Sequence, residues 1–145
     1  MTDIDDRTQT IHARLGGDAT FAAIAARFYA RMDGERRYAR LRAMHPDDLE
    51  PTRASLTGFL IGWAGGPRDW FAANPGRCMM SMHTGMTIDP EVAGQWAECM
   101  EHAIRDVLPD PAPGVAPGFD AEARDIVADA LTRTAHALGR AQQFR

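Results

Sequence analysis

His83 is the residue whose type and position suggest chemistry most directly. It lies in a short non-regular segment, 16 residues after Pro67 of a Gly65-Gly66-Pro67 turn and 13 residues before Trp96. A zinc site needs three or four His, Cys or carboxylate ligands that converge on one ion. One imidazole offered from a short segment between two helices therefore suits a single axial metal ligand better than a zinc site.

The segment that carries His83 must be positioned by helices. Four stretches repeat apolar side chains at the spacing of one helical face: 21–32, 52–63, 96–107 and 126–138. Asp18, Asp89 and Asp120 are the predicted N-caps of the first, third and fourth helices, and Pro90 occupies a first turn. The Gly-Gly-Pro turn ends the second helix, and no stretch has the alternation of a strand. The pattern predicts an all-α fold.

The stretch 68–87, between the second and third helices, is interrupted by proline and glycine and can hold only short helical pieces. Antiparallel helix pairs joined through such a segment can open a slot for a flat apolar ligand.

Composition narrows the class of protein. The 145 residues suit one domain, and 16 basic against 20 acidic side chains give a net charge of −4. The basic residues are spread along the chain, which argues against nucleic acid as a partner. We expect a cytoplasmic protein without membrane contact, because the start is polar and no run approaches the ~20 apolar residues of a membrane span. Cys78 and Cys99 are interpreted as reduced thiols.

Several motifs agree with one family in both letters and spacing: Phe28-Tyr29, Met44-His45-Pro46-Asp47-Asp48-Leu49, Phe59-Leu60, Gly65-Gly66-Pro67, His83, Ile88 and Trp96. Together they resemble group II truncated haemoglobins, from about Leu15 to Leu138. The resemblance implies a two-over-two helical sandwich, the truncated globin fold, with haem (iron protoporphyrin IX) in the slot. It also implies one globin domain over 1–145, with an N-terminal extension at 1–14 and a Pro-rich interhelical loop at 109–118.

The resemblance also implies roles for individual residues. His83 is the proximal ligand, which binds iron through Nε2 as a neutral imidazole. Tyr29 and Trp96 are hydrogen-bond donors on the distal side, although each also fits plain packing on a core helix. His45 is a third distal polar residue or, equally well, a half-exposed histidine in a polar turn.

The second predicted helix forms one side of the slot. The resemblance implies that Thr52 faces the haem. It also implies that three larger residues form an apolar ceiling, which is compatible with ordinary core packing too: Leu56, Phe59 and Leu60.

The sequence departs from the family next to His83. Group II members usually carry arginines one and three residues before the proximal histidine, where this chain has Met82 and Met80. Arg68 or Arg77 are candidates to replace them at the haem propionates, and Met79 and Met82 are expected along the slot. Cys78 and the methionines around His83 also suit Cu(I), because soft sulfur ligands favour that ion.

Three functions remain open from the sequence. The first is a haem protein that reversibly binds oxygen or another diatomic ligand at a five-coordinate iron, as in oxygen transport. The second is a haem enzyme with nitric oxide dioxygenase or peroxidase-like activity and a redox partner. The third is a helical domain without haem that binds copper or a protein partner. The sequence is compatible with a monomer or a homodimer.

Overall fold

The computed structural model describes residues 9–75 and 88–143, and within these ranges the regular structure is helical, without any strand. The elements in chain order are α1 (Ile11–Arg14), α2 (Asp18–Gly34), η2 (Arg36–Tyr38), α3 (Ala39–Ala43), α4 (Glu50–Trp63), α5 (Asp69–Ala73), α7 (Pro90–Val107) and α8 (Ala121–Gln143). The four long helices α2, α4, α7 and α8 correspond to the four predicted ones. The all-α prediction is confirmed.

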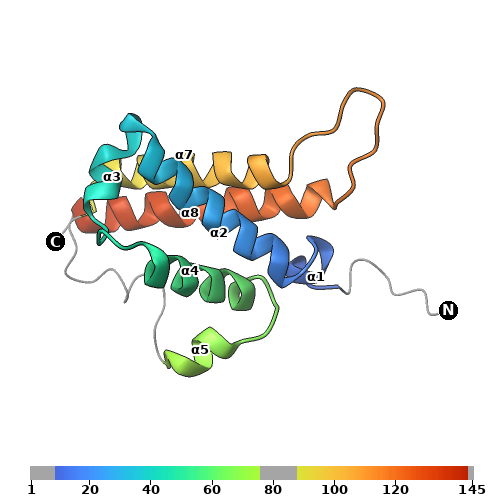
Figure 1. Cartoon of the computed structure of the whole chain (residues 1–145), viewed down its shortest axis with the longest axis horizontal. Helices are drawn as coiled ribbons and strands as arrows, with labels where there is room; N and C mark the ends of the chain where they lie inside the picture. Colours follow the sequence, from blue (N-terminus) through green and yellow to red (C-terminus); the bar gives the residue numbers. More distant parts are fainter. Residues whose placement is uncertain (1–8, 76–87, 144–145) are drawn as a thin grey trace.

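The long helices form two pairs, α7 with α8 and α2 with α4. α7 and α8 lie side by side and antiparallel, and α2 crosses α7 while it also packs on α4 (Figure 1). The core between them is made by the apolar faces that the periodicity predicts, including Phe21, Ile24 and Met32 on α2. Ile126 was expected on the buried face of α8 and is instead 46% exposed. That prediction is wrong because the neighbouring Val127 occupies the core position.

Two of the three predicted N-caps are present. The Asp89 side chain accepts a hydrogen bond from the Val92 backbone N–H at 2.9 Å, and the Asp120 side chain accepts one from Ala123 at 3.0 Å. The prediction for Asp18 is wrong, because α2 already begins at Asp18 and Gly17, with φ of 82°, is its N-cap. The Asp18 carboxylate lies 2.6 Å from Nε2 of His12.

Two glycines on α4 allow α5 to pack closely against it. A Cβ at Gly62 would lie 2.6 Å from the Phe71 ring, and one at Gly58 would lie 3.0 Å from the Trp70 side chain. The Phe71 and Trp70 rings both contact the ring of Phe59. The expectation of a short helical piece in 68–87 is confirmed by α5. The glycines of α4 leave room for its aromatic side chains.

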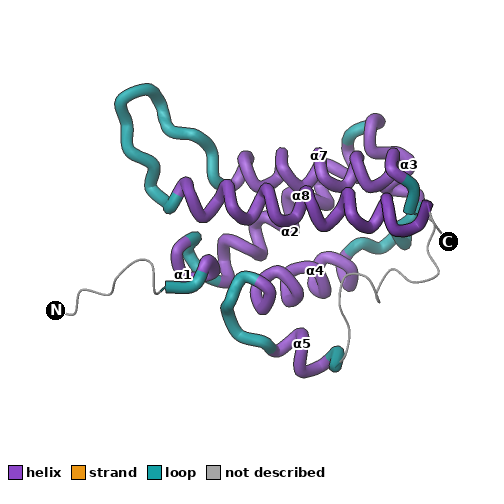
Figure 2. The backbone as a smooth tube through the Cα atoms, turned by 180° about the vertical axis from the view of Figure 1, so that it is seen from behind, coloured by secondary structure: helices purple, strands orange, loops and turns teal. Residues whose placement is uncertain are grey.

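The connection between α7 and α8 projects from the helices as a long loop (Figure 2). The guanidinium of Arg124 anchors its first part, donating to the Leu108 carbonyl at 3.0 Å and to Asp110 at 2.7 Å. Arg14 anchors its end through Asp120 at 2.7 Å. None of the helices in the described ranges is both long and apolar enough to cross a membrane.

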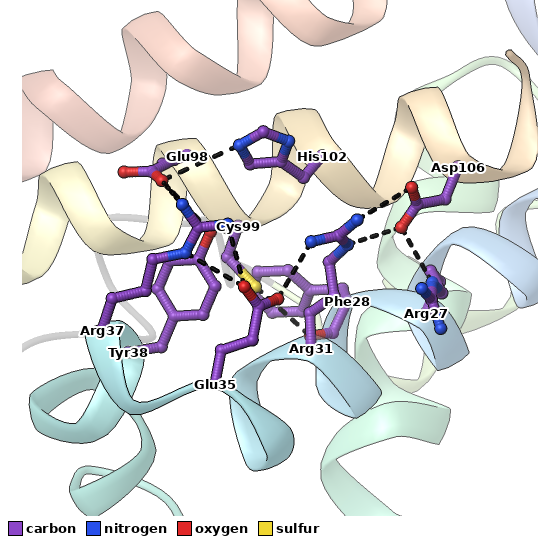
Figure 3. Close-up of polar contacts among 10 residues, drawn as sticks. All are labelled: Arg27, Phe28, Arg31, Glu35, Arg37, Tyr38, Glu98, Cys99, His102 and Asp106. Carbon is purple, nitrogen blue, oxygen red and sulfur yellow. Dashed lines mark hydrogen bonds and ion pairs between the residues drawn. The ribbon is translucent and has the colours of Figure 1, made fainter.

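Ion pairs fix the register between α2 and α7 (Figure 3). The Asp106 carboxylate accepts from Nε of Arg27 at 2.8 Å and from both Nε and Nη2 of Arg31, at 2.5 and 2.9 Å. These two arginines lower the pKa of Asp106 to about 2, Arg31 being the larger cause. Arg37 continues the row on η2 by pairing with Glu98 of α7 at 2.7 Å.

Candidate functional site

A cavity of about 290 Å³ opens between the two helix pairs. Its walls come from α2, the segment around α3, α4, α7 and α8, and most of its lining is apolar. The described residues that line it are Tyr29, Leu41, Met44, His45, Pro46, Thr52, Leu56, Ile88, Val92, Ala93, Trp96, Ala135 and Leu138. Five residues that were selected from the sequence therefore meet at one cavity: Tyr29, His45, Thr52, Leu56 and Trp96.

Tyr29 brings a hydroxyl to this apolar space. The residue lies on the inner face of α2 and is only 6% exposed. Within residues 9–75 and 88–143 no hydrogen-bond partner accepts from its phenol. Burial, and secondarily the nearby Cys99, raises the pKa of Tyr29 well above its usual value, so the hydroxyl keeps its proton. It is a hydrogen-bond donor for whatever occupies the cavity.

Trp96 adds a second polar hydrogen from α7. Its indole N–H also has no acceptor in the described part of the chain. The ring of Phe28 contacts both donors edge-on, with centroids 4.9 Å from Tyr29 and 5.3 Å from Trp96. The backbone carbonyl of Phe28 accepts from Sγ of Cys99 on α7 at 3.3 Å. Phe28 thus fixes the two donors relative to each other.

His45 lies in the cavity wall and is half-buried. Its Nδ1 is 2.8 Å from the Leu41 carbonyl, which only accepts, so Nδ1 carries the proton and Nε2 is the acceptor of the neutral ring. The ring packs against that of Tyr29, with 5.8 Å between the centroids. His45 is therefore half-buried in a non-regular segment and also lines the cavity, so its role as a distal polar residue stays a prediction.

The two halves of α4 have different surroundings. Thr52 and Leu56, in the first half, line the cavity. Phe59 and Leu60, in the second half, are buried in the core outside the cavity lining, where Phe59 contacts the rings of α5. Their place beside haem stays a prediction.

Eight lining residues were not among the selected site residues. Their signals were weak in the sequence: two belong to the His45 motif, one more was quoted for the family resemblance, and the other five are apolar residues on helices. They are Leu41, Met44, Pro46, Ile88, Val92, Ala93, Ala135 and Leu138. Helical periodicity cannot separate such residues from those of the solid core.

The residues predicted on the proximal side, His83, Arg77, Met79 and Met82, lie outside the described residues, as do the other members of the sulfur-rich cluster. Arg68 is described, and its guanidinium lies over the Phe71 ring, 4.3 Å from the centroid, not along the cavity. In the described ranges no group of three or more His, Cys, Asp or Glu side chains is arranged to hold a metal ion.

A mostly apolar cavity between helices, with a few polar side chains in its lining, is typical of a small-molecule or cofactor site. Residues 10–138 match the family model described as bacterial-like globin, so the chain belongs to the bacterial-like globin family. Globins carry haem, which identifies the cofactor class, and the mostly apolar lining with the donors of Tyr29 and Trp96 fits that group.

Solved structures of truncated haemoglobins, one of them of group II, are similar to this chain. It is 28% identical to the group II 2-on-2 haemoglobin of Agrobacterium tumefaciens, with a TM-score of 0.80 over 93% of this chain and 97% of that one. It is also 28% identical to the cold-adapted truncated haemoglobin of Pseudoalteromonas haloplanktis, with a TM-score of 0.78 over 90% and 97%. The predicted truncated globin fold is confirmed.

Proposed function

We propose that this globin reversibly binds oxygen or another diatomic ligand at haem held in the cavity. The observation that carries the proposal is the pair of donors, the Tyr29 hydroxyl and the Trp96 indole N–H, which meet in an apolar cavity without a partner in the described structure. Each donor can form a hydrogen bond worth on the order of 1 kcal/mol with a polar ligand in the cavity.

Haem, when bound, would supply an iron ion that can bind a diatomic ligand. By the resemblance, His83 would hold that iron through Nε2. The aliphatic side chains of Leu56, Val92 and Leu138 exclude water from the cavity and contribute to haem retention by apolar burial. Tyr29 and Trp96 orient the ligand by donating hydrogen bonds to it.

An optical spectrum of the protein expressed with haem supplementation tests the proposal. We expect a Soret band that shifts when carbon monoxide is added to the ferrous protein. His83→Ala should remove or strongly alter the band, whereas His136→Ala, which changes an exposed histidine on α8, should leave it intact. A wild-type spectrum unchanged by His83→Ala would overturn the assignment of the proximal ligand.

The second candidate function is haem redox chemistry, as nitric oxide dioxygenation or peroxide-dependent oxidation. Two donors at one cavity favour it over oxygen delivery, because they slow the release of a bound polar ligand. Consumption of nitric oxide or peroxide well above that of free haem, reduced by Tyr29→Phe, is the expected result for an enzyme. Turnover equal to that of free haem would exclude it in favour of reversible binding.

A further inference from the structure

The guanidinium of Arg42 donates hydrogen bonds to the backbone carbonyls of the segment that carries His45. Nη1 donates to the carbonyls of Pro46 at 3.0 Å and His45 at 3.4 Å, and Nη2 donates to the carbonyl of Asp47 at 3.1 Å. Three successive carbonyls of a non-regular segment are thus satisfied by one planar, always charged group. Arginine is suited to this task because its five N–H donors have a fixed geometry.

The helix that carries Arg42 is itself held by contacts with neighbouring helices. α3, which carries Arg42, is tied to α7 by a hydrogen bond from the Leu41 backbone N–H to Oε1 of Gln95 at 3.1 Å. Arg40 adds ion pairs with Asp89 and Glu91, both at 2.6 Å. Nε of Arg42 also pairs with Asp33 of α2 at 2.9 Å. The position of residues 45–47 therefore follows the framework of α2, α3 and α7.

The hydrogen bonds of Arg42 affect the cavity, because Met44, His45 and Pro46 all line it. The His45 backbone carbonyl accepts from Arg42, and its ring contacts the Leu41 carbonyl through Nδ1. The ring then lies against Tyr29. Neither contact alone fixes both the place of the imidazole and its tautomer, whereas the two together do so.

We propose that Arg42 is a positioning residue for the distal side of the cavity: it holds residues 45–47 so that the His45 imidazole stays beside Tyr29 as the Nδ1–H tautomer. This inference rests on the proposed function for its effect on ligand binding, although not for the structural effect. It identifies a residue outside the cavity lining that tunes the cavity through backbone carbonyls.

The test uses nuclear magnetic resonance of the ¹⁵N-histidine-labelled, full-length holoprotein in the diamagnetic ferrous carbon monoxide form. The ring nitrogen shifts of His45 report its tautomer directly. Wild type, Arg42→Met, Arg42→Lys, Asp33→Ala and Arg53→Met are compared. Asp33→Ala removes the acidic partner that Arg42 has within the described residues and keeps the carbonyl contacts. Arg53→Met removes an arginine that pairs within α4 with Glu50.

We expect the Nδ1–H tautomer to dominate in wild type, Asp33→Ala and Arg53→Met. In Arg42→Met it should give way to a mixture of tautomers. Arg42→Lys should lie between them, because it keeps the charge but cannot reach three carbonyls at once, and it also serves as the readout if Arg42→Met does not fold. An unchanged His45 tautomer in both Arg42 variants would overturn the proposal. Equal loss in Asp33→Ala would overturn it too, because the ion pair with α2 would then be the cause.

Ligand dissociation gives the second readout. Arg42→Met should change the carbon monoxide dissociation rate about two- to fivefold, in the same direction as His45→Ala. If His45→Ala leaves the rate unchanged, the proposed role of His45 in ligand binding fails. The tautomer measurement still decides separately whether Arg42 positions the ring, so the two failures are distinguishable.

Discussion

The rings of Tyr29 and His45 meet edge to face, with their centroids 5.8 Å apart and an angle of 72° between their planes. Tyr29 comes from α2 and His45 from the segment after α3, so this contact joins two elements that line the cavity. The Phe28 ring also contacts the Tyr29 ring, with 4.9 Å between the centroids. The phenol is thus held in place before any ligand arrives, which preorganises its hydroxyl as a donor.

Replacing Tyr29 with phenylalanine should speed dissociation of a diatomic ligand about fivefold, the equivalent of one hydrogen bond of ~1 kcal/mol. Stopped-flow displacement of oxygen by carbon monoxide measures this rate. Tyr38→Phe is the matched control, because Tyr38 is also fully buried but does not line the cavity. Equal dissociation rates for Tyr29→Phe and wild type would show that Tyr29 does not donate a hydrogen bond to the ligand.

The Trp96→Phe variant removes the indole N–H and keeps an aromatic ring beside Phe28. We expect a few-fold faster dissociation, again on the order of 1 kcal/mol. Because Phe28 contacts both donors, the effects of Trp96→Phe and Tyr29→Phe should not add in the double variant. Strict additivity of the logarithms of the rates would contradict the shared positioning by Phe28.

The contribution of Tyr29 to ligand binding should not depend on pH between 7 and about 10, the ordinary pKa of a tyrosine. Burial raises the pKa of its phenol, so the neutral donor persists where a free tyrosine ionises. The contribution of the neutral Tyr29 phenol to folding stability is fully present below pH 10, and it is lost as the pH rises through the raised pKa of Tyr29. The ratio of the ligand dissociation rates of Tyr29→Phe and wild type, measured across this pH range, tests the prediction. A change in this ratio with a midpoint near pH 10 would contradict it.

Substituting Asp106 with asparagine should lower the free energy of unfolding at pH 7 by about 1–2 kcal/mol, because Arg27 and Arg31 lose their shared carboxylate. The depressed pKa of about 2 means that the stabilisation is present above the unfolded value near 4. It is lost as pH falls toward 2. Urea unfolding of both proteins at several pH values tests this, and a difference that stays constant from pH 7 to 3 would refute it.

Gly62→Ala should destabilise the protein by about 1–3 kcal/mol, because the new methyl group would lie 2.6 Å from the Phe71 ring. Gly94→Ala is the matched control on α7, where nothing lies within 4 Å of the added Cβ. There the substitution should stabilise the helix by up to about 1 kcal/mol. Thermal unfolding of both variants gives the comparison, and equal signs would contradict the close packing of α4 and α5.

Sequence periodicity sufficed for the long helices, because their apolar faces and the caps Asp89 and Asp120 are local signals. It failed at Asp18, because Gly17, with a positive φ, is the N-cap of α2 and the Asp18 carboxylate pairs with His12 instead. It also could not divide the apolar face of α4 into a cavity half at Leu56 and a core half at Phe59, since that division depends on α5.

The candidate site depended on family spacing rather than on periodicity. Tyr29, His45 and Trp96 come from three different elements, and no helical pattern brings them together. Arg42 gave no signal in the sequence at all, because its partners are backbone carbonyls, which every residue type offers.

Titration of the haem-free protein with haemin, followed at the Soret band, tests the central claim that this cavity holds one haem. The family, the apolar lining and the two donors predict saturation at one equivalent of haemin per chain. Ala135→Trp, which places an indole in the cavity lining, should weaken that binding strongly. Binding without a one-to-one end point, or binding unaffected by Ala135→Trp, would contradict the claim.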